Sequence, residues 1–555
     1  MPHPSLVLRG GRVATPVSPR GYVEAIAING SVISALGSNE EIDALRGPST
    51  RVVDLAGRLA VPAFGDAHVH AISGGLESQR CNLLGLRSRQ DCLDRIATYA
   101  AVQPVEGWVL GGGWALEAFP GGTPTAADLD QVCGDRPAFL PNRDHHSAWV
   151  NSAALERAGI DARTPDPPNG RIERLPDDTP SGTLHESAMA LVARHLAPTS
   201  REEMSSALRT ALKTLHGYGI THWQDACVGD AGEIGVVDTY DAYRSAALEG
   251  WLTARVRGAL WWDRSKGLEQ VDFLLGRREA APAGAFRATS VKIMVDGVCE
   301  MFTAAMSRAY LGTPGRDGSH RGDLFIERDL LVDAVRALDA EDFQVHFHAI
   351  GDRAVSVSLD AAESVGETRW GVNRHHVAHL QFIDPHELDR FARLGVIANF
   401  QPLWACSDPQ MEVFTIPYVG EDRIDWQYSI ASLQRLRTRI AFGSDWPVSS
   451  PNPLDEIHVA VNRCLSTNLG HPDTDETTRP FRPEERISVA EALAAFTTGV
   501  AYVNGDENLL GVLDVGRQAD VAVLSQDILS IPTTEIGYTT VDVTVAGGAV
   551  VHGDE

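Results

Sequence analysis

Strand-like and helix-like segments alternate through most of this 555-residue chain. Eight segments are expected to form strands: 59–68, 219–225, 252–261, 286–295, 343–349, 374–381, 395–401 and 439–445. Apolar residues recur with helical spacing between several of them, for example over 330–338 and 388–394. Alternating strands and helices are typical of parallel α/β sheets, and eight such units predict a (β/α)8 barrel of the TIM type.

The gap between the first two expected strands is far longer than one helix requires. It contains a segment rich in proline and aspartate over 164–182. We therefore predict a subdomain, inserted over 71–216, inside a barrel domain that spans 59–507.

Both ends of the chain consist of short apolar runs separated by turns. Asn29-Gly30 lies between two such runs near the start, and Gly547-Gly548 lies between two near the end. Asn-Gly between alternating apolar runs is a strong hairpin signal. Because neither end carries enough apolar surface to fold alone, we expect residues 1–58 and 508–555 to build one small composite β-sandwich.

Residues able to bind metal lie near the ends of several expected strands. His68 and His70 occupy alternate positions of Asp66-Ala67-His68-Val69-His70, so both side chains face the same side of the first strand. Lys292 lies in an apolar strand, where a lysine requires a partner, a lowered pKa or a modification. The remaining candidates near strand ends are His346, His348, His379 and Asp445.

Each of these residues also has an ordinary structural explanation. Histidine pairs occur in strands without metal, a lysine can extend to a strand end, and Asp445 could cap a helix. Together they are distributed over five strands of a barrel whose catalytic residues gather at the carboxyl ends of its strands. This distribution predicts one shared metal site.

The motifs DAHVH, VKIMVDG, HAIGD, VAHLQ and FGSDWPV resemble those of the amidohydrolase superfamily. The chain is most similar to the third family of that superfamily, which includes the N-substituted formamide deformylases. The resemblance extends to Asp144–Ser152, to Gln401-Pro402 and to Gly516–Asp520. The usual Pro-Gly turn before the first motif is Pro62-Ala63-Phe64-Gly65 here, so the local strand geometry differs while the ligands are retained.

The resemblance implies a metal centre with two divalent ions, Zn²⁺ above all, bridged by a carboxylated Lys292. His68 and His70 would bind the more buried ion, and His348 and His379 the more exposed one. Asp445 would bind metal and move a proton between water and the leaving group.

The implied reaction is hydrolysis of a non-peptide C–N bond, in an N-substituted amide or formamide, by metal-activated hydroxide. His146 would polarise the carbonyl or orient the substrate. His346 shares the face of His348 and is either a ligand, a support for one or a contact of the substrate. The expected substrate contacts are Trp114, Trp149, His346 and Trp404, and residues 404–428 form a long loop that could close over them.

Two other functions fit the same sequence. A single metal with an unmodified Lys292 would suit a deaminase or a cyclic amide hydrolase. A barrel that has lost its metal would act as a scaffold or assembly protein, although the intact ligands argue against this alternative.

The amino-acid composition argues against some classes of binding partner. Acidic residues outnumber basic ones by 74 to 48, which argues against nucleic acid or an anionic membrane as the main partner. Seven scattered cysteines without a CxxC motif, and no apolar stretch of about 18 residues, favour a cytoplasmic protein without a membrane span. A small-molecule substrate is the expected partner, together with a second copy of the chain in a homodimer.

Overall fold

Eight parallel strands form the central sheet of the computed structural model, which describes residues 3–15, 21–104, 107–232, 237–312, 318–470 and 474–553. They follow one another in chain order: β8 (Phe64–Val69), β15 (Ile220–Val228), β16 (Arg255–Trp261), β17 (Phe286–Met294), β18 (Gln344–Ala349), β19 (His376–His379), β20 (Ile397–Phe400) and β21 (Ile440–Phe442). This order confirms the predicted (β/α)8 architecture.

The segment after β21 closes the barrel against β8. The Asp445 amide donates a hydrogen bond to the His68 carbonyl at 2.7 Å, and the His70 amide donates to the Trp446 carbonyl at 2.9 Å. A side chain at Gly443 would collide with the His68 backbone nitrogen, 2.4 Å from the position of its Cβ. Glycine therefore permits the close approach that brings Asp445 beside His68.

The buried Asp66 carboxylate reinforces this closure. It accepts hydrogen bonds from the Ser444 amide at 3.1 Å and from the Ser444 hydroxyl at 2.6 Å. It also accepts one from the His68 amide at 3.0 Å. One side chain thus joins the first and last strands at the end where the ligands lie.

The predicted first strand, 59–68, is wrong in extent. Its first half is β7 (Leu59–Pro62), which pairs with β2 (Arg12–Ala14) and with β22 (Val521–Leu524) outside the barrel. The barrel strand starts only where the Phe64 amide bonds to the Gly219 carbonyl. Because one apolar run continues through both strands, no turn residue reveals the change of sheet.

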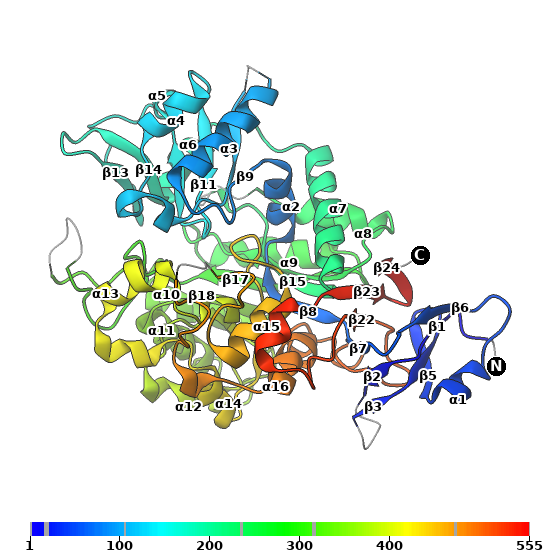
Figure 1. Ribbon diagram of the computed structural model, residues 1–555. Helices are drawn as coiled ribbons and strands as arrows, with labels where there is room; N and C mark the ends of the chain where they lie inside the picture. Colours follow the sequence, from blue (N-terminus) through cyan, green and yellow to red (C-terminus); the bar gives the residue numbers. More distant parts are fainter. Residues whose placement is uncertain are drawn as a thin grey trace.

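Helices flank the barrel strands (Figure 1). In α10 (Arg328–Ala340), Leu331, Ala334, Val335 and Leu338 are buried, which is the spacing of one helical face. The other α-helices outside the inserted region are α1 (Asn39–Asp43), α2 (Ala71–Gln79), α7 (Arg201–Gly217), α8 (Tyr240–Leu248), α9 (Val271–Ala280), α11 (Asp352–Glu363), α12 (Leu388–Leu394), α13 (Ile416–Val419), α14 (Ile430–Arg435), α15 (Pro453–Asn462), α16 (Val489–Ala494) and α17 (Val500–Val503). No helix in the described ranges has the length and apolar character needed to cross a membrane.

The region between α2 and α7 forms a separate six-stranded sheet, drawn in blue to cyan above the barrel (Figure 1). Its strands are β13 (Gly170–Arg174), β14 (Pro180–Glu186), β12 (Ser147–Val150), β11 (Ala138–Pro141), β10 (Val109–Gly112) and β9 (Cys81–Asn82), in that spatial order. Its helices are α3 (Arg89–Val102), α4 (Ala126–Cys133), α5 (Ser152–Ala158) and α6 (Ala190–Ala193). We call this region the insert.

The insert is narrower than the predicted 71–216, because residues of α2 and α7 belong to the barrel core. The core of the insert is continuous with loops that follow the barrel strands. Met301, Tyr310 and Phe382 from those loops pack into the same cluster as Trp114 and Trp149. The insert therefore covers the end of the barrel where the strand carboxyl termini lie.

The two chain ends meet in a pair of sheets beside the barrel. One contains β5 (Val32–Gly37), β4 (Ala25–Asn29), β1 (Leu6–Arg9) and β6 (Arg51–Asp54). The other contains β24 (Ala549–His552), β23 (Val541–Ala546), β22, β7, β2 and β3 (Tyr22–Val23). Leu8 and Ile26 share a buried cluster with Val521 and Val545, so the termini have one common core.

Candidate metal centre and cavity

A cavity of about 390 Å³ lies where the barrel strands end beneath the insert. All six predicted metal ligands line it: His68, His70, Lys292, His348, His379 and Asp445. They come from β8 and the residue after it, from β17, β18 and β19, and from the segment after β21, so residues up to 377 positions apart meet in one site. Pairing of Met294 with His348 sets the register of the two central strands.

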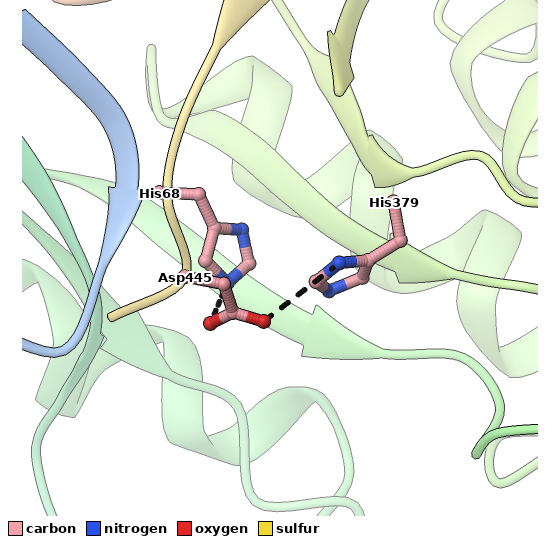
Figure 2. A group of neighbouring side chains, drawn as sticks. All are labelled: His68, His379 and Asp445. Carbon is pink, nitrogen blue, oxygen red and sulfur yellow. Dashed lines mark ion pairs between the residues drawn. The ribbon is translucent and has the colours of Figure 1, made fainter. Parts of the chain in front are cut away.

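His68, His379 and Asp445 form the tightest group, with one potential ligand atom from each lying within 4.8 Å of the others. Figure 2 shows the Asp445 carboxylate between the two imidazole rings. Asp445 Oδ1 lies 3.3 Å from His68 Nε2 and 3.0 Å from His70 Nε2, and Oδ2 lies 3.9 Å from His379 Nδ1. Asp445 is therefore the common neighbour of three imidazoles.

The donor atoms of this site suit a metal ion. His379 Nδ1 and Asp445 Oδ1 are buried and, although imidazoles lie near the carboxylate, neither atom makes a well-aligned hydrogen bond within the described residues. Buried polar atoms are normally satisfied, so atoms of this kind that face one cavity call for a shared ligand. Imidazole nitrogens combined with a carboxylate form a typical donor set for Zn²⁺-like ions.

The electrostatics of the site also favour metal binding. Burial, assisted by Lys292, lowers the pKa of His68 to about 3, and burial holds the pKa of His348 and His379 well below the ordinary histidine value. Burial alone would raise the pKa of Asp445, but its imidazole neighbours hold it well below the usual range. The group thus combines neutral imidazoles with an anionic carboxylate, the protonation states that metal ligands require.

The exposed fractions of the histidines do not match the expectation that His68 and His70 bind the more buried ion. His70, assigned to the more buried ion, has 24% of its side chain exposed, whereas His348 and His379 are nearly fully buried. The centroids of the His348 and His379 rings lie 4.4 Å apart, so these two histidines are direct neighbours.

Lys292 lies at the centre of the site with only 3% of its surface exposed. Its Nζ is 3.4 Å from His68 Nε2. Burial lowers its pKa to about 8, and its charge in turn lowers the pKa of His68, His348 and His379. The amine therefore lies within electrostatic range of both predicted histidine pairs.

His346 does not line the cavity but lies behind His68, and it is fully buried. Its Nε2 is 2.9 Å from His68 Nδ1, and its Nδ1 is 2.7 Å from Gln224 Oε1. His376 Nε2 bonds to the same Gln224 oxygen at 2.9 Å. His346 thus supports and orients His68, and its prediction as a substrate contact is corrected.

His146 lines the cavity from the insert and has a partner that sequence reasoning missed. Its Nδ1 lies 3.0 Å from both carboxylate oxygens of Glu186, at the end of β14. The Thr303 hydroxyl donates to Glu186 at 2.6 Å. Burial would lower the pKa of His146, but Glu186 raises it to about 9. Glu186 and Thr303 stand outside any motif, so only the fold reveals this group.

Of the three predicted tryptophan contacts, the structure brings only Trp404 to the cavity. Its ring is stacked on His379, with centroids 5.3 Å apart and an interplanar angle of 4°. Trp114 and Trp149 are fully buried in the insert core, and their indole N–H groups donate to the carbonyls of Leu140 and Thr125. Their assignment to the substrate is corrected: they pack the insert.

The family model described as "Amidohydrolase family" matches residues 51–552. The chain belongs to the amidohydrolase family. It is accordingly a metal-dependent hydrolase that acts on C–N bonds.

Individual proteins extend this comparison. The chain is 31% identical to the protein LONG AFTER FAR-RED 3 of Arabidopsis thaliana, over 94% of this chain and 87% of that one. It is 25% identical to an N-substituted formamide deformylase of Arthrobacter pascens, over 96% and 95% of the two chains. A solved uncharacterized metal-dependent hydrolase from Pyrococcus furiosus superposes with a TM-score of 0.70 at 26% identity, covering 95% of this chain and all of that one.

Replacing Trp114 by alanine should destabilise the insert by about 3–5 kcal/mol, because it empties a fully buried aromatic site. Chemical denaturation followed by tryptophan fluorescence measures this loss. Val102→Ala, at a position 77% exposed in α3 of the same insert, should leave the stability unchanged. A raised KM with full stability in Trp114→Ala would instead restore its role in substrate binding.

Proposed function

We propose that this protein hydrolyses the C–N bond of N-substituted amides, with formamides as the first class to test. The observation that carries the proposal is the buried Lys292 amine among the ligand histidines. Similarity to an N-substituted formamide deformylase supports the choice of substrate.

An unmodified lysine is poorly suited to this position. A protonated Lys292 would repel any cation held by His68, whose Nε2 lies 3.4 Å from the amine. Reaction of the neutral amine with CO2, with loss of one N–H proton to solvent, would replace the cation with an anionic carbamate. The charge conflict would then be removed, and Lys292 would offer oxygen donors beside both histidine pairs.

The residues present would hold two divalent ions, with Zn²⁺ the best match to the donor set. His68 and His70 would serve one ion, His348 and His379 the other, and Lys292 and Asp445 would complete the site. The close grouping of His68, His379 and Asp445 also favours a second candidate, a one-metal enzyme with unmodified Lys292.

Bound divalent ions would supply Lewis acidity for water and for the substrate carbonyl. Asp445 then acts as the proton carrier: its buried carboxylate takes a proton from the attacking water and returns it to the departing nitrogen. His146 contributes from the insert, because Glu186 holds its Nδ1 and leaves Nε2 to donate to the carbonyl oxygen. Trp404, fixed on the His379 ring, gives the substrate a flat apolar surface.

Lys292→Ala should lower bound metal from about two equivalents to about one or fewer and reduce kcat at least about a hundredfold. Added acetate or propionate should partly restore activity by replacing the carbamate oxygens. Elemental analysis and single-substrate kinetics measure both effects, with Lys266→Ala as a control at an exposed lysine. Full metal content and full rate in Lys292→Ala would refute the bridge, and one equivalent in the unaltered enzyme would favour the one-metal candidate.

Asp445→Asn should retain the fold and most of the metal but lose about 10²–10⁴-fold in kcat, because an amide cannot carry the proton. Metal analysis and steady-state kinetics on N-benzylformamide test this separation. Asp475→Asn, at an exposed carboxylate, serves as the control. Near-normal turnover by Asp445→Asn would exclude the proton-carrier role.

Glu186→Gln should lower kcat about tenfold to a hundredfold with a smaller change in KM, because His146 loses the anion that orients it. A similar pair in the insert provides a matched control: Glu173 lies 3.2 Å from His185 Nε2, and neither residue lines the cavity. Glu173→Gln should leave kcat within about twofold. Equal losses in both variants would reduce Glu186 to a structural role.

A further inference from the structure

The end of the cavity formed by the insert and the barrel loops has an unusual balance of charge. Four carboxylates line it, from Glu117, Asp144, Glu300 and Asp408, together with one guanidinium, from Arg143. They belong to four separate segments, so the fold rather than a local motif gathers them. We call these five residues the acidic end. Arg87, which also lines the cavity, is paired with Glu476 at 3.3 Å and leaves this balance unchanged.

Arg143 does not neutralise the acidic end. Its Nη1 lies 3.5 Å from Glu117 Oε1, and its other terminal nitrogen donates to the neutral Gln410 side chain. Burial would lower the pKa of Arg143, but Glu117, Asp408, Asp144 and Glu300 together raise it, so all four carboxylates act on one cation. Burial raises the pKa of Glu300 and of Asp408, and in Asp408 it outweighs the opposing effect of Arg143.

Unused hydrogen-bonding groups point to a missing partner. Tyr428 lines the cavity with only 2% of its surface exposed, and its hydroxyl has no hydrogen bond among the described residues. This hydroxyl shares the cavity lining with Glu300 and Asp408, whose charges act on it. Glu117 Oε2 is a buried atom that also lacks a partner in the described chain.

A small inorganic ion does not fit this arrangement. Among the described residues, the only acidic or histidine group close enough for one metal ion is His68, His379 and Asp445. No three carboxylates of the acidic end therefore come close enough to share one metal ion, and Arg143 would repel such an ion. A larger organic cation with several N–H donors can reach carboxylates and the Tyr428 hydroxyl together.

We propose that the acidic end binds a protonated amine or guanidinium group carried by the substrate, remote from the C–N bond that is cut. This inference rests on the proposed function for the identity of that bond. Leu86 and Met411 also line the cavity, so an apolar chain can connect the cation to the reacting carbonyl. The enzyme would thus select basic N-substituted amides and reject anionic ones such as N-acyl amino acids.

Three formamides of similar length test the charge preference: N-(5-aminopentyl)formamide, N-hexylformamide and 6-formamidohexanoate. We expect kcat/KM for the cationic substrate to exceed that for the neutral one about tenfold to a hundredfold, the effect of hydrogen bonds to charged groups. The anionic substrate should be the poorest. Equal values for all three, or a preference for the anion, would overturn the inference.

Two variants test whether the preference for the cationic substrate arises at the acidic end. Glu300→Gln and Tyr428→Phe should each lower the cationic-to-neutral ratio of kcat/KM, Glu300→Gln by about tenfold. Tyr428→Phe keeps the buried ring and removes only the hydroxyl, so it remains informative if the glutamate variant folds poorly. Asp422→Asn, an exposed carboxylate on the neighbouring surface, is the matched control and should leave the ratio unchanged. Unchanged ratios in both test variants would contradict the assignment.

A binding experiment separates this inference from the proposed reaction. Calorimetry on the metal-loaded protein compares pentylguanidinium, which stays protonated and is a poor metal ligand, with neutral 1-hexanol. Tighter binding of pentylguanidinium that is weakened in Glu300→Gln supports the inference even if no formamide is hydrolysed. If the protein hydrolyses formamides but does not prefer pentylguanidinium, the inference is overturned and the proposed function stands. The inference is also overturned if the protein binds a third equivalent of metal that Glu300→Gln removes.

Discussion

The joint between β8 and the segment after β21 is the constraint on which the site depends. Backbone hydrogen bonds from Asp445 to His68 and from His70 to Trp446 fix the two ligand-bearing segments against each other. Gly443 permits the approach, and the Asp66 carboxylate ties the Ser444 backbone and hydroxyl to the first strand. The other seven strand pairings do not involve this joint, so it is the closure that places Asp445 beside the histidines.

Hydrogen bonds behind the cavity also hold two of the predicted ligand histidines in place. His346, Gln224 and His376 form a buried chain of hydrogen bonds behind His68. Asp296 plays a similar part near His348: its carboxylate accepts from the amides of Ile350 and Gly351 and lies 3.4 Å from His348 Nδ1. Rings held in this way lose little conformational freedom on binding, which favours affinity and a fixed coordination geometry.

The barrel, and the grouping of the candidate ligands in one cavity, could be predicted because short segments of sequence reveal which residues alternate along a strand and where the strand ends. It failed where the outcome depends on contacts between distant segments. The run from Leu59 to Val69 looks like one strand, yet its halves pair with different sheets. Trp114 and Trp149 look like substrate contacts beside a motif, but the insert buries them. Glu186 and Tyr428 carry no local signal, since their importance arises only from what the fold places around them.

The chemistry and the selectivity that we propose consequently come from different parts of the molecule. The barrel supplies the ligands, on strand ends that pairing holds in register. The insert supplies His146 and Glu186, and it shares the acidic end with loops after β17 and β20. Loops and insertions tolerate change better than paired strands do. The proposed charge selectivity therefore rests on side chains of loops and of the insert, whereas Lys292, Asp445 and the histidines of the cavity lie on or beside paired strands.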